Sequence, residues 1–128
     1  VLPIMLAQGT GSIVTVASEA TLGAGAAGVA YTTSKHAVAG LVKSIAYYYG
    51  PQGIRSNAVL PGGVETNIGT TAAPLTTWSM ERAQLSMATM GPMAQPDQIA
   101  TAISWLASDE ASNINGALLT ADGGWSAA

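Results

Sequence analysis

Two short runs of apolar and β-branched residues, separated by a long stretch with helical spacing, restrict this chain to few folds. The runs are residues 12–17, SIVTVA, and residues 54–60, IRSNAVL, and turn residues bound both. Such runs favour buried strands. Between them, apolar residues recur at helical spacing from 31 to about 49, where a Gly-Pro pair ends the helix. This order predicts a βαβ unit with parallel strands and a right-handed crossover.

The remaining segments extend the same pattern. Residues 67–93 are polar and then rich in methionine, which predicts a lid with a short helix at about 80–90. Pro96 suits the first position of a further helix, with Asp97 in its first turn. Residues 116–124, GALLTADGG, predict a last strand and a glycine turn, and residues 1–11 resemble the end of a helix. The order β-α-β-lid-α-β indicates an α/β fold with a parallel sheet in residues 1–128.

Composition narrows the classes of function. The 128 residues include only four lysines and arginines, which are scattered, so no basic patch for nucleic acid is expected. No apolar run approaches the roughly 20 residues that span a bilayer, so no membrane partner is expected either. The chain has no cysteine, which excludes disulfide and thiolate chemistry and fits a cytoplasmic location.

Polar residues gather where the predicted strands end. Ser18 directly follows the first strand, Pro61-Gly62-Gly63 follows the second, and Tyr31 opens the intervening helix. Ligands of parallel α/β sheets bind beyond the carboxyl ends of the strands. We therefore expect these residues to share one edge of the sheet.

Tyr31 and Lys35 lie four residues apart, which places both side chains on one face of the helix. A free tyrosine has a pKa of about 10 and is a poor base at neutral pH. A nearby ammonium favours the phenolate, so the pair can perform general acid–base chemistry while the Ser18 hydroxyl holds a carbonyl oxygen. On the spacing alone, an amphipathic helix start with a solvated lysine is the more frequent case.

The wider pattern decides between these interpretations. GSIVTVAS at 11–18, YTTSK at 31–35, GIRSNAVLPGGVET at 53–66, QPDQIATAISWLASDEAS at 95–112 and GALLTADGG at 116–124 follow one another in order. This series resembles the C-terminal half of a short-chain dehydrogenase/reductase and covers nearly the whole chain. Ser18 precedes Tyr31 by 13 residues, as in that family.

The resemblance implies a Rossmann-like fold, an NAD or NADP cofactor and a small alcohol or carbonyl substrate. It implies that Tyr31 is the catalytic acid/base, that Lys35 stabilises its phenolate and holds the nicotinamide ribose hydroxyls, and that Ser18 orients the substrate oxygen. The residues that it assigns to the nicotinamide carboxamide are Pro61, Gly62, the backbone of Val64 and the hydroxyl of Thr66. For Thr66, a helix N-cap is an equal alternative.

Three further residues are candidates for contact with substrate. Glu19 follows Ser18 and is interpreted either as a contact to a polar substrate or as a solvated carboxylate. Trp78 and Met87 belong to the lid segment, where methionines either line an apolar substrate site or simply pack the helix.

The family's Gly-rich nucleotide loop and its catalytic asparagine would lie upstream of residue 1. Without that half, the first strand has a bare apolar edge, so we expect association with the N-terminal half or with another copy. Two alternatives stay open. One is a catalytically inactive fragment with structural or interaction behaviour only. The other is an epimerase or dehydratase of nucleotide sugars, enzymes that also use a Tyr-x-x-x-Lys pair.

Overall fold

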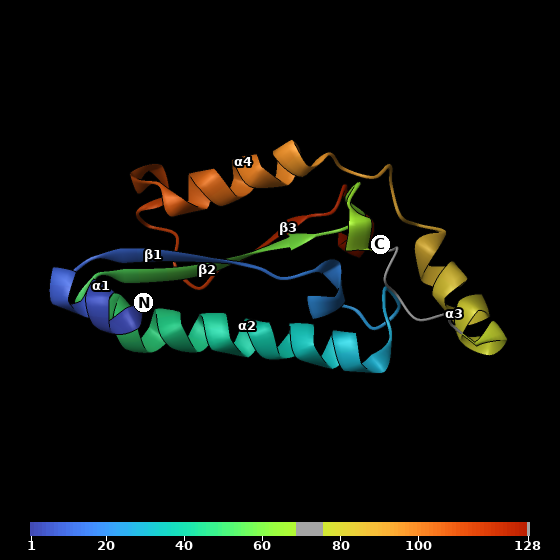
Figure 1. Ribbon diagram of the computed structural model, residues 1–128, viewed down its shortest axis with the longest axis horizontal. Coiled ribbons are helices and arrows are strands. Elements are labelled where there is room, and N and C mark those ends of the chain that lie inside the picture. Colours follow the sequence, from blue (N-terminus) through green and yellow to red (C-terminus); the bar gives the residue numbers. More distant parts are fainter. Residues whose placement is uncertain (69–75, 128) are drawn as a thin grey trace.

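The structure is a computed structural model that describes residues 1–68 and 76–127, and these residues alternate between helices and strands (Figure 1). The order along the chain agrees with the predicted β-α-β-lid-α-β series, and the short helix at the start agrees with the prediction that residues 1–11 form the end of a helix. The helices are α1 (Leu2–Gln8), α2 (Val29–Tyr49), α3 (Thr77–Met87) and α4 (Pro96–Ala107), and the strands are β1 (Gly11–Val16), β2 (Ile54–Pro61) and β3 (Leu118–Ala121).

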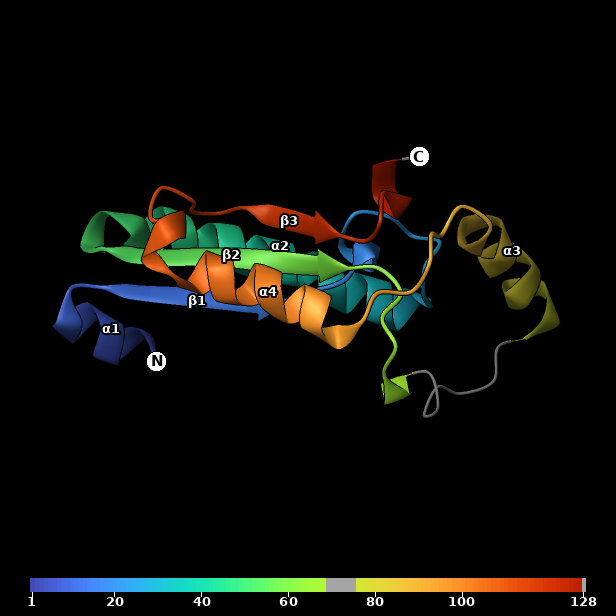
Figure 2. The ribbon, with the colours of Figure 1, turned by 90° about the horizontal axis from the view of Figure 1, so that it is seen from above.

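The three strands form one parallel sheet in the order β1-β2-β3, which confirms the predicted α/β fold (Figure 2). β2 is the central strand: Gly11 of β1 pairs with Ile54, and Leu118 of β3 pairs with Ala58. All residues of β2 except Arg55 are buried. A parallel strand that helices cover on both faces is expected to be apolar, as residues 58–60 are, whereas Arg55, Ser56 and Asn57 of the same strand are polar.

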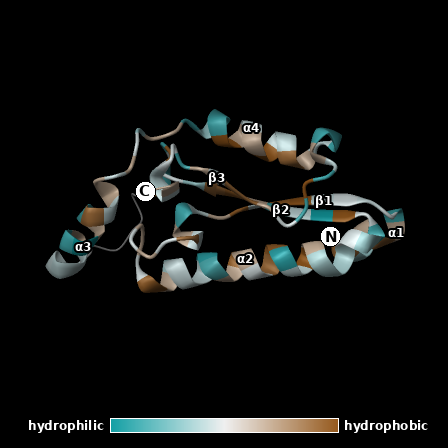
Figure 3. Cartoon of the chain, turned by 180° about the vertical axis from the view of Figure 1, so that it is seen from behind, coloured by the Kyte–Doolittle hydropathy of each residue, from teal (hydrophilic) through white to brown (hydrophobic). Residues whose placement is uncertain are grey.

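Helices α2 and α4 cover opposite faces of the sheet, which gives three layers (Figure 1). Alternate residues of β2 point to opposite faces. Ala58 and Leu60 accordingly pack with Val42 of α2, whereas Val59 packs with Ile99 and other residues of α4. Hydrophobic colouring follows the strands and the inner side of α4, while its outer side is more hydrophilic (Figure 3). Among the described residues, no helix is both long and apolar enough to cross a membrane.

Two helices begin earlier than the sequence predicted. α2 starts at Val29, two residues before Tyr31, because the N–H of Thr32 donates to the carbonyl of Gly28 at 3.0 Å. This bond closes the first helical turn, which includes Tyr31. α3 covers Thr77–Met87 rather than 80–90, and a further turn at Thr89 and Met90 follows it. The lid prediction falls partly outside the described residues, since 69–75 are not among them.

The predicted last strand and glycine turn of residues 116–124 are both present. Leu118–Ala121 forms β3, and Gly116, Gly123 and Gly124 on either side of it take positive φ values of 78°, 65° and 88°. Left-handed backbone of this kind belongs to turns and does not continue a strand.

Asn57 of β2 holds the loop before β3 to the sheet. Its amide donates to the carbonyl of Ile114 at 2.9 Å, and its oxygen accepts from the N–H of Ala117 at 2.9 Å. The side chain is fully buried, so its role is structural.

Candidate active site

The carboxyl ends of the strands and the start of α2 meet at one edge of the molecule (Figure 2). The short 3-10 turn Glu19–Thr21 follows β1 at this edge and packs against α2. Pro61 ends β2 there, and the N-terminal turn of α2 carries Tyr31. The predicted grouping of these residues at one edge is therefore observed.

Lys35 is the best-defined side chain of this edge. Its Nζ donates to the backbone carbonyl of Val16 at 3.2 Å and lies 5.5 Å from the centre of the Tyr31 ring. The bond fixes the ammonium beside the end of β1, on the same side of α2 as the tyrosine. Tyr31 itself is 37% exposed, so its hydroxyl is accessible to a ligand.

Ser18 is half-buried and begins the 3-10 turn after β1. Its Oγ accepts a hydrogen bond from the N–H of Ala20 at 3.2 Å. The turn is held to the sheet just before it, where the N–H of Ala17 donates to the carbonyl of Val59 at 2.8 Å. A hydroxyl that accepts one bond can still donate one, so Ser18 retains a hydrogen for a substrate oxygen.

The segment after β2 runs along the same edge. Gly62 permits close packing there: a Cβ would lie 3.0 Å from both Cα and Cβ of Asp122. Val64 forms an isolated parallel bridge with Ala94, which ties this segment to the residues before α4. Thr66 Oγ1 accepts from the N–H of Ile68 at 3.4 Å. That bond fits the N-cap interpretation and leaves the exposed hydroxyl able to donate.

Glu19 is buried, with 6% of its surface exposed, so the interpretation as a solvated carboxylate is wrong. The 3-10 turn after β1 places the Glu19 side chain in the protein interior, close to the glycine turn that follows β3. Burial, and secondly the charge of Asp122, raise the pKa of the Glu19 carboxyl above its ordinary value.

The carboxylate of Asp122 is tied to its own turn. It accepts from the N–H of Gly124 at 3.0 Å and from the N–H of Ser126 at 2.9 Å. Burial acts to raise the pKa of Asp122, but the hydrogen bonds from Ser126 and Gly124 outweigh it and hold the pKa below its ordinary value. The two carboxyl pKa values are therefore shifted in opposite directions, that of Glu19 upward and that of Asp122 downward.

The two lid candidates, Trp78 and Met87, belong to α3. Trp78, at the start of α3, is 71% exposed, and Met87, at its end, is 45% exposed. α3 projects beyond the end of the sheet and has no buried residue (Figure 1). Plain packing of the lid helix is thus not observed. Contact of either side chain with substrate stays a prediction.

Trp125 and Asp122 were not recognised from the sequence. Trp125 is 8% exposed, and its indole N–H donates to the carbonyl of Ser86 at 2.8 Å, which joins the end of α3 to the C-terminal turn. The sequence ADGG at residues 121–124 predicts a turn but gives no role to its aspartate. An aspartate ahead of two glycines is a signal for side-chain to backbone capping, and it would have identified Asp122.

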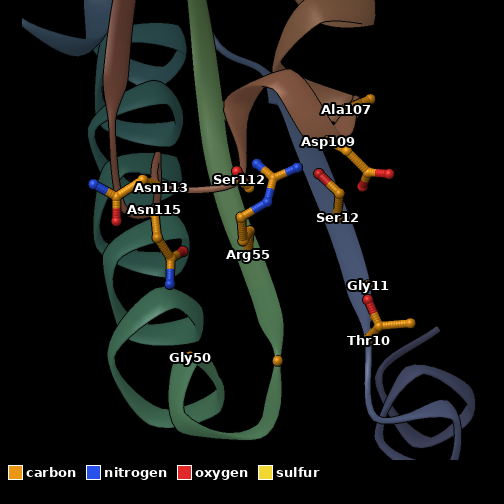
Figure 4. Close-up of a pocket in the computed structure, with 11 residues that line it drawn as sticks. Thr10, Gly11, Ser12, Gly50, Arg55, Ala107, Asp109, Ser112, Asn113 and Asn115 are labelled. Atoms are coloured by element: carbon orange, nitrogen blue, oxygen red, sulfur yellow. The ribbon is translucent and has the colours of Figure 1, made fainter.

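A cavity of about 510 Å³ lies at the opposite, amino end of the sheet (Figure 4). The Arg55 guanidinium there donates to the carbonyls of Leu106 and Ser108, both at 2.9 Å, and of Ile114 at 3.3 Å. The first two bonds cap the C-terminus of α4 and the third holds the loop before β3, so Arg55 has a structural role. In the part of the chain that is described, no group of three or more potential metal ligands exists.

The fold and this edge define a Rossmann-like α/β protein with its polar site at the carboxyl ends of the strands. The profile of the family described as Enoyl-(acyl carrier protein) reductase matches residues 1–126. The short-chain dehydrogenase/reductase cdmF of Talaromyces verruculosus is 41% identical over 98% of this chain and 52% of its own length. The chain belongs to the short-chain dehydrogenase/reductase family.

Solved structures agree with this assignment. A gluconate 5-dehydrogenase from Burkholderia cenocepacia, in complex with NADP and tartrate, is 30% identical, with a TM-score of 0.81 over 100% of this chain and 49% of that one. A short chain dehydrogenase from Mycobacterium paratuberculosis, bound to NAD, is 33% identical, with a TM-score of 0.82 over 99% of this chain and 49% of that one. The chain thus spans about half the length of the relatives it matches.

Proposed function

We propose that this chain forms the catalytic and substrate half of an NAD(P)-dependent oxidoreductase that interconverts an alcohol and a carbonyl. The observation that carries the proposal is the position of Lys35, whose Nζ is held 3.2 Å from the Val16 carbonyl and 5.5 Å from the Tyr31 ring. This pair stands at the edge where parallel α/β sheets bind their ligands.

In this proposal Tyr31 moves the proton. During oxidation its phenolate oxygen takes the proton of the substrate hydroxyl, and during reduction its hydroxyl returns a proton to the carbonyl oxygen. The Lys35 ammonium stabilises the phenolate because an opposite charge nearby favours the ionised form. Ser18 donates a hydrogen bond to the same substrate oxygen and so fixes its position relative to Tyr31.

The residues of the edge fit a nicotinamide nucleotide. The Lys35 ammonium has three N–H donors and gives one to Val16, which leaves donors for ribose hydroxyls. The Thr66 hydroxyl can donate to the carboxamide, beside Pro61, Gly62 and the backbone of Val64. When bound, NAD or NADP supplies the hydride acceptor or donor. Solved relatives hold NADP or NAD, which supports the same assignment.

The β1 edge supports a proposal about partners. β1 is an outer strand of the described sheet, and Val16 at its end is 48% exposed. A free edge of this kind pairs with a further strand, either from the N-terminal half of the relatives or from another copy. Light scattering of the chain as given should show association. A monodisperse monomer at moderate concentration would contradict this proposal.

Isotope transfer tests the proposed reaction. The complete protein, as its gene encodes it, is supplied with NAD⁺ or NADP⁺ and a panel of secondary alcohols deuterated at the carbinol carbon. We expect deuterium in the reduced cofactor and a ketone as product. Reduced cofactor without deuterium would contradict hydride transfer from the carbinol carbon, and no ketone from any alcohol would favour the inactive alternative. A cytoplasmic location remains a prediction that fractionation of cells can check.

A further inference from the structure

Residues 61–66, the carboxamide segment, are the part of the chain that the proposed function assigns to the nicotinamide. Gly63 lies inside this segment, and two methionines from the residues after α3 pack against it. A Cβ at Gly63 would lie 3.1 Å from Met90 Sδ and 3.3 Å from Met93 Cγ. Since Gly63 has no side chain, both methionines lie against its backbone, and their packing helps to fix the position of the segment.

Backbone hydrogen bonds connect the carboxamide segment to the same methionine-containing stretch. The N–H of Ala94 donates to the carbonyl of Gly63 at 2.8 Å, and the N–H of Glu65 donates to the carbonyl of Ala94 at 3.0 Å. These bonds accompany the parallel bridge between Val64 and Ala94. Met93 precedes Ala94 in the chain, so a displacement of Met93 also moves the residue that holds Val64 in place.

The thioether is the reactive group of this contact. The chain has no cysteine, so methionine is its only sulfur-containing residue type. Met93 is 48% exposed and Met90 is half-buried, so solvent reaches the pair. Hydrogen peroxide oxidises an accessible thioether to the sulfoxide. The sulfur lone pair forms a bond to one peroxide oxygen, the O–O bond breaks, and the other oxygen leaves as water, so the sulfur loses two electrons and the peroxide gains them.

We propose that Met90 and Met93 form a reversible oxidation site through which peroxide weakens the binding of the nicotinamide cofactor. Sulfoxidation converts a flexible apolar side chain into a polar one, which disrupts the packing that the side chain makes. Here the packing lost is that against Gly63, so the carboxamide segment shifts away from its position in the reduced protein. This inference rests on the proposed function, because that function assigns the segment to the nicotinamide.

Cofactor binding before and after oxidation tests the proposal. The complete protein is treated with dilute hydrogen peroxide, freed of peroxide and titrated with NADH or NADPH, followed by nicotinamide fluorescence. Peptide mass spectrometry locates each added oxygen. We expect oxygen at Met90 or Met93 and a Kd about tenfold higher, since a tenfold change equals about 1.4 kcal/mol, within the cost of a polar group that loses its partners on burial. Methionine sulfoxide reductases should restore the native Kd.

Leucine variants assign the effect to these two side chains. The double variant Met90→Leu, Met93→Leu removes both thioethers at nearly constant volume, so it should keep the native Kd and lose the response to peroxide. Met80→Leu is the matched control, because Met80 is 46% exposed on α3, and it should respond as the native protein does. A double variant that still responds to peroxide, or oxygen at Met80 but at neither Met90 nor Met93, would overturn the inference.

Hydrogen exchange without cofactor separates this inference from the proposed function. The amides of Glu65 and Ala94, which connect the two segments, should exchange about tenfold faster after oxidation, and the amide of Val59 in β2 should exchange at the native rate. This result supports the inference even when no alcohol is oxidised. Unchanged exchange of Glu65 and Ala94, or equal acceleration at Val59, contradicts it even when the protein binds the cofactor and oxidises alcohols.

Discussion

Trp125→Phe should loosen α3 from the rest of the protein without unfolding it. Trp125 is buried, and its indole N–H donates to the carbonyl of Ser86 at 2.8 Å, one residue before the end of α3. A phenylalanine retains most of the buried ring but cannot donate this bond. α3 buries no residue of its own, so a single anchoring bond has a large share in its position.

The size of the effect follows from that bond. A hydrogen bond contributes about 0.5–1.5 kcal/mol net, and we take about 1 kcal/mol here. One kcal/mol changes an equilibrium constant about fivefold. The opening equilibrium of α3 should therefore increase about fivefold, while global stability falls by no more than about 1 kcal/mol.

Native-state hydrogen exchange measures local opening directly. In Trp125→Phe, amides of α3 should exchange about fivefold faster, and those of the central strand β2 should exchange at nearly the native rate. Trp105→Phe is the matched control, because Trp105 is 41% exposed on α4. Unchanged exchange in α3, or equal acceleration in α3 and β2, would refute the view that Trp125 anchors this helix.

Two further predictions concern stability. Arg55→Leu removes the bonds to two carbonyls at the end of α4 and to the Ile114 carbonyl of the loop before β3, and it should lower the free energy of unfolding by about 2–4 kcal/mol in urea titrations. The exposed Arg82→Leu is the control, and a loss below about 0.5 kcal/mol in Arg55→Leu would contradict the capping role. Folding raises the pKa of the Glu19 carboxyl, so the folded state binds the carboxyl proton more tightly than the unfolded state does. The free energy of unfolding therefore decreases as pH rises from the ordinary glutamate pKa through the raised pKa of the folded state. Glu19→Gln removes this loss, so the stability of the variant relative to the native protein should increase with pH across that window. A difference that is constant or that decreases with pH would show that the carboxyl is not destabilised by burial.

Much of the fold could be predicted because it depends on local pattern. The spacing of Tyr31 and Lys35, and the position of Ser18 directly after a strand, place all three at the carboxyl edge once the strands are parallel. The burial of Glu19 could not be predicted this way. Glutamate is rarely buried, and its position depends on contacts with segments around Ser86 and Asp122, far away in the sequence.

Helix and strand ends were the less predictable part. α2 begins before Tyr31 because a backbone bond to Gly28 closes the first turn, a bond that no side-chain signal announces. Such details depend on the packing of neighbouring elements, which outweighs local preference.

The turnover number of Tyr31→Phe in the complete protein tests the central claim most directly. The change removes one hydroxyl from a side chain that is already 37% exposed, so the fold and the Lys35 contact to Val16 should persist. We predict that kcat for alcohol oxidation falls by about 10²–10⁴, the contribution of a positioned acid/base, while NAD(P)H binding is retained. A kcat within a few-fold of native would contradict the assignment of Tyr31 as the group that transfers the proton.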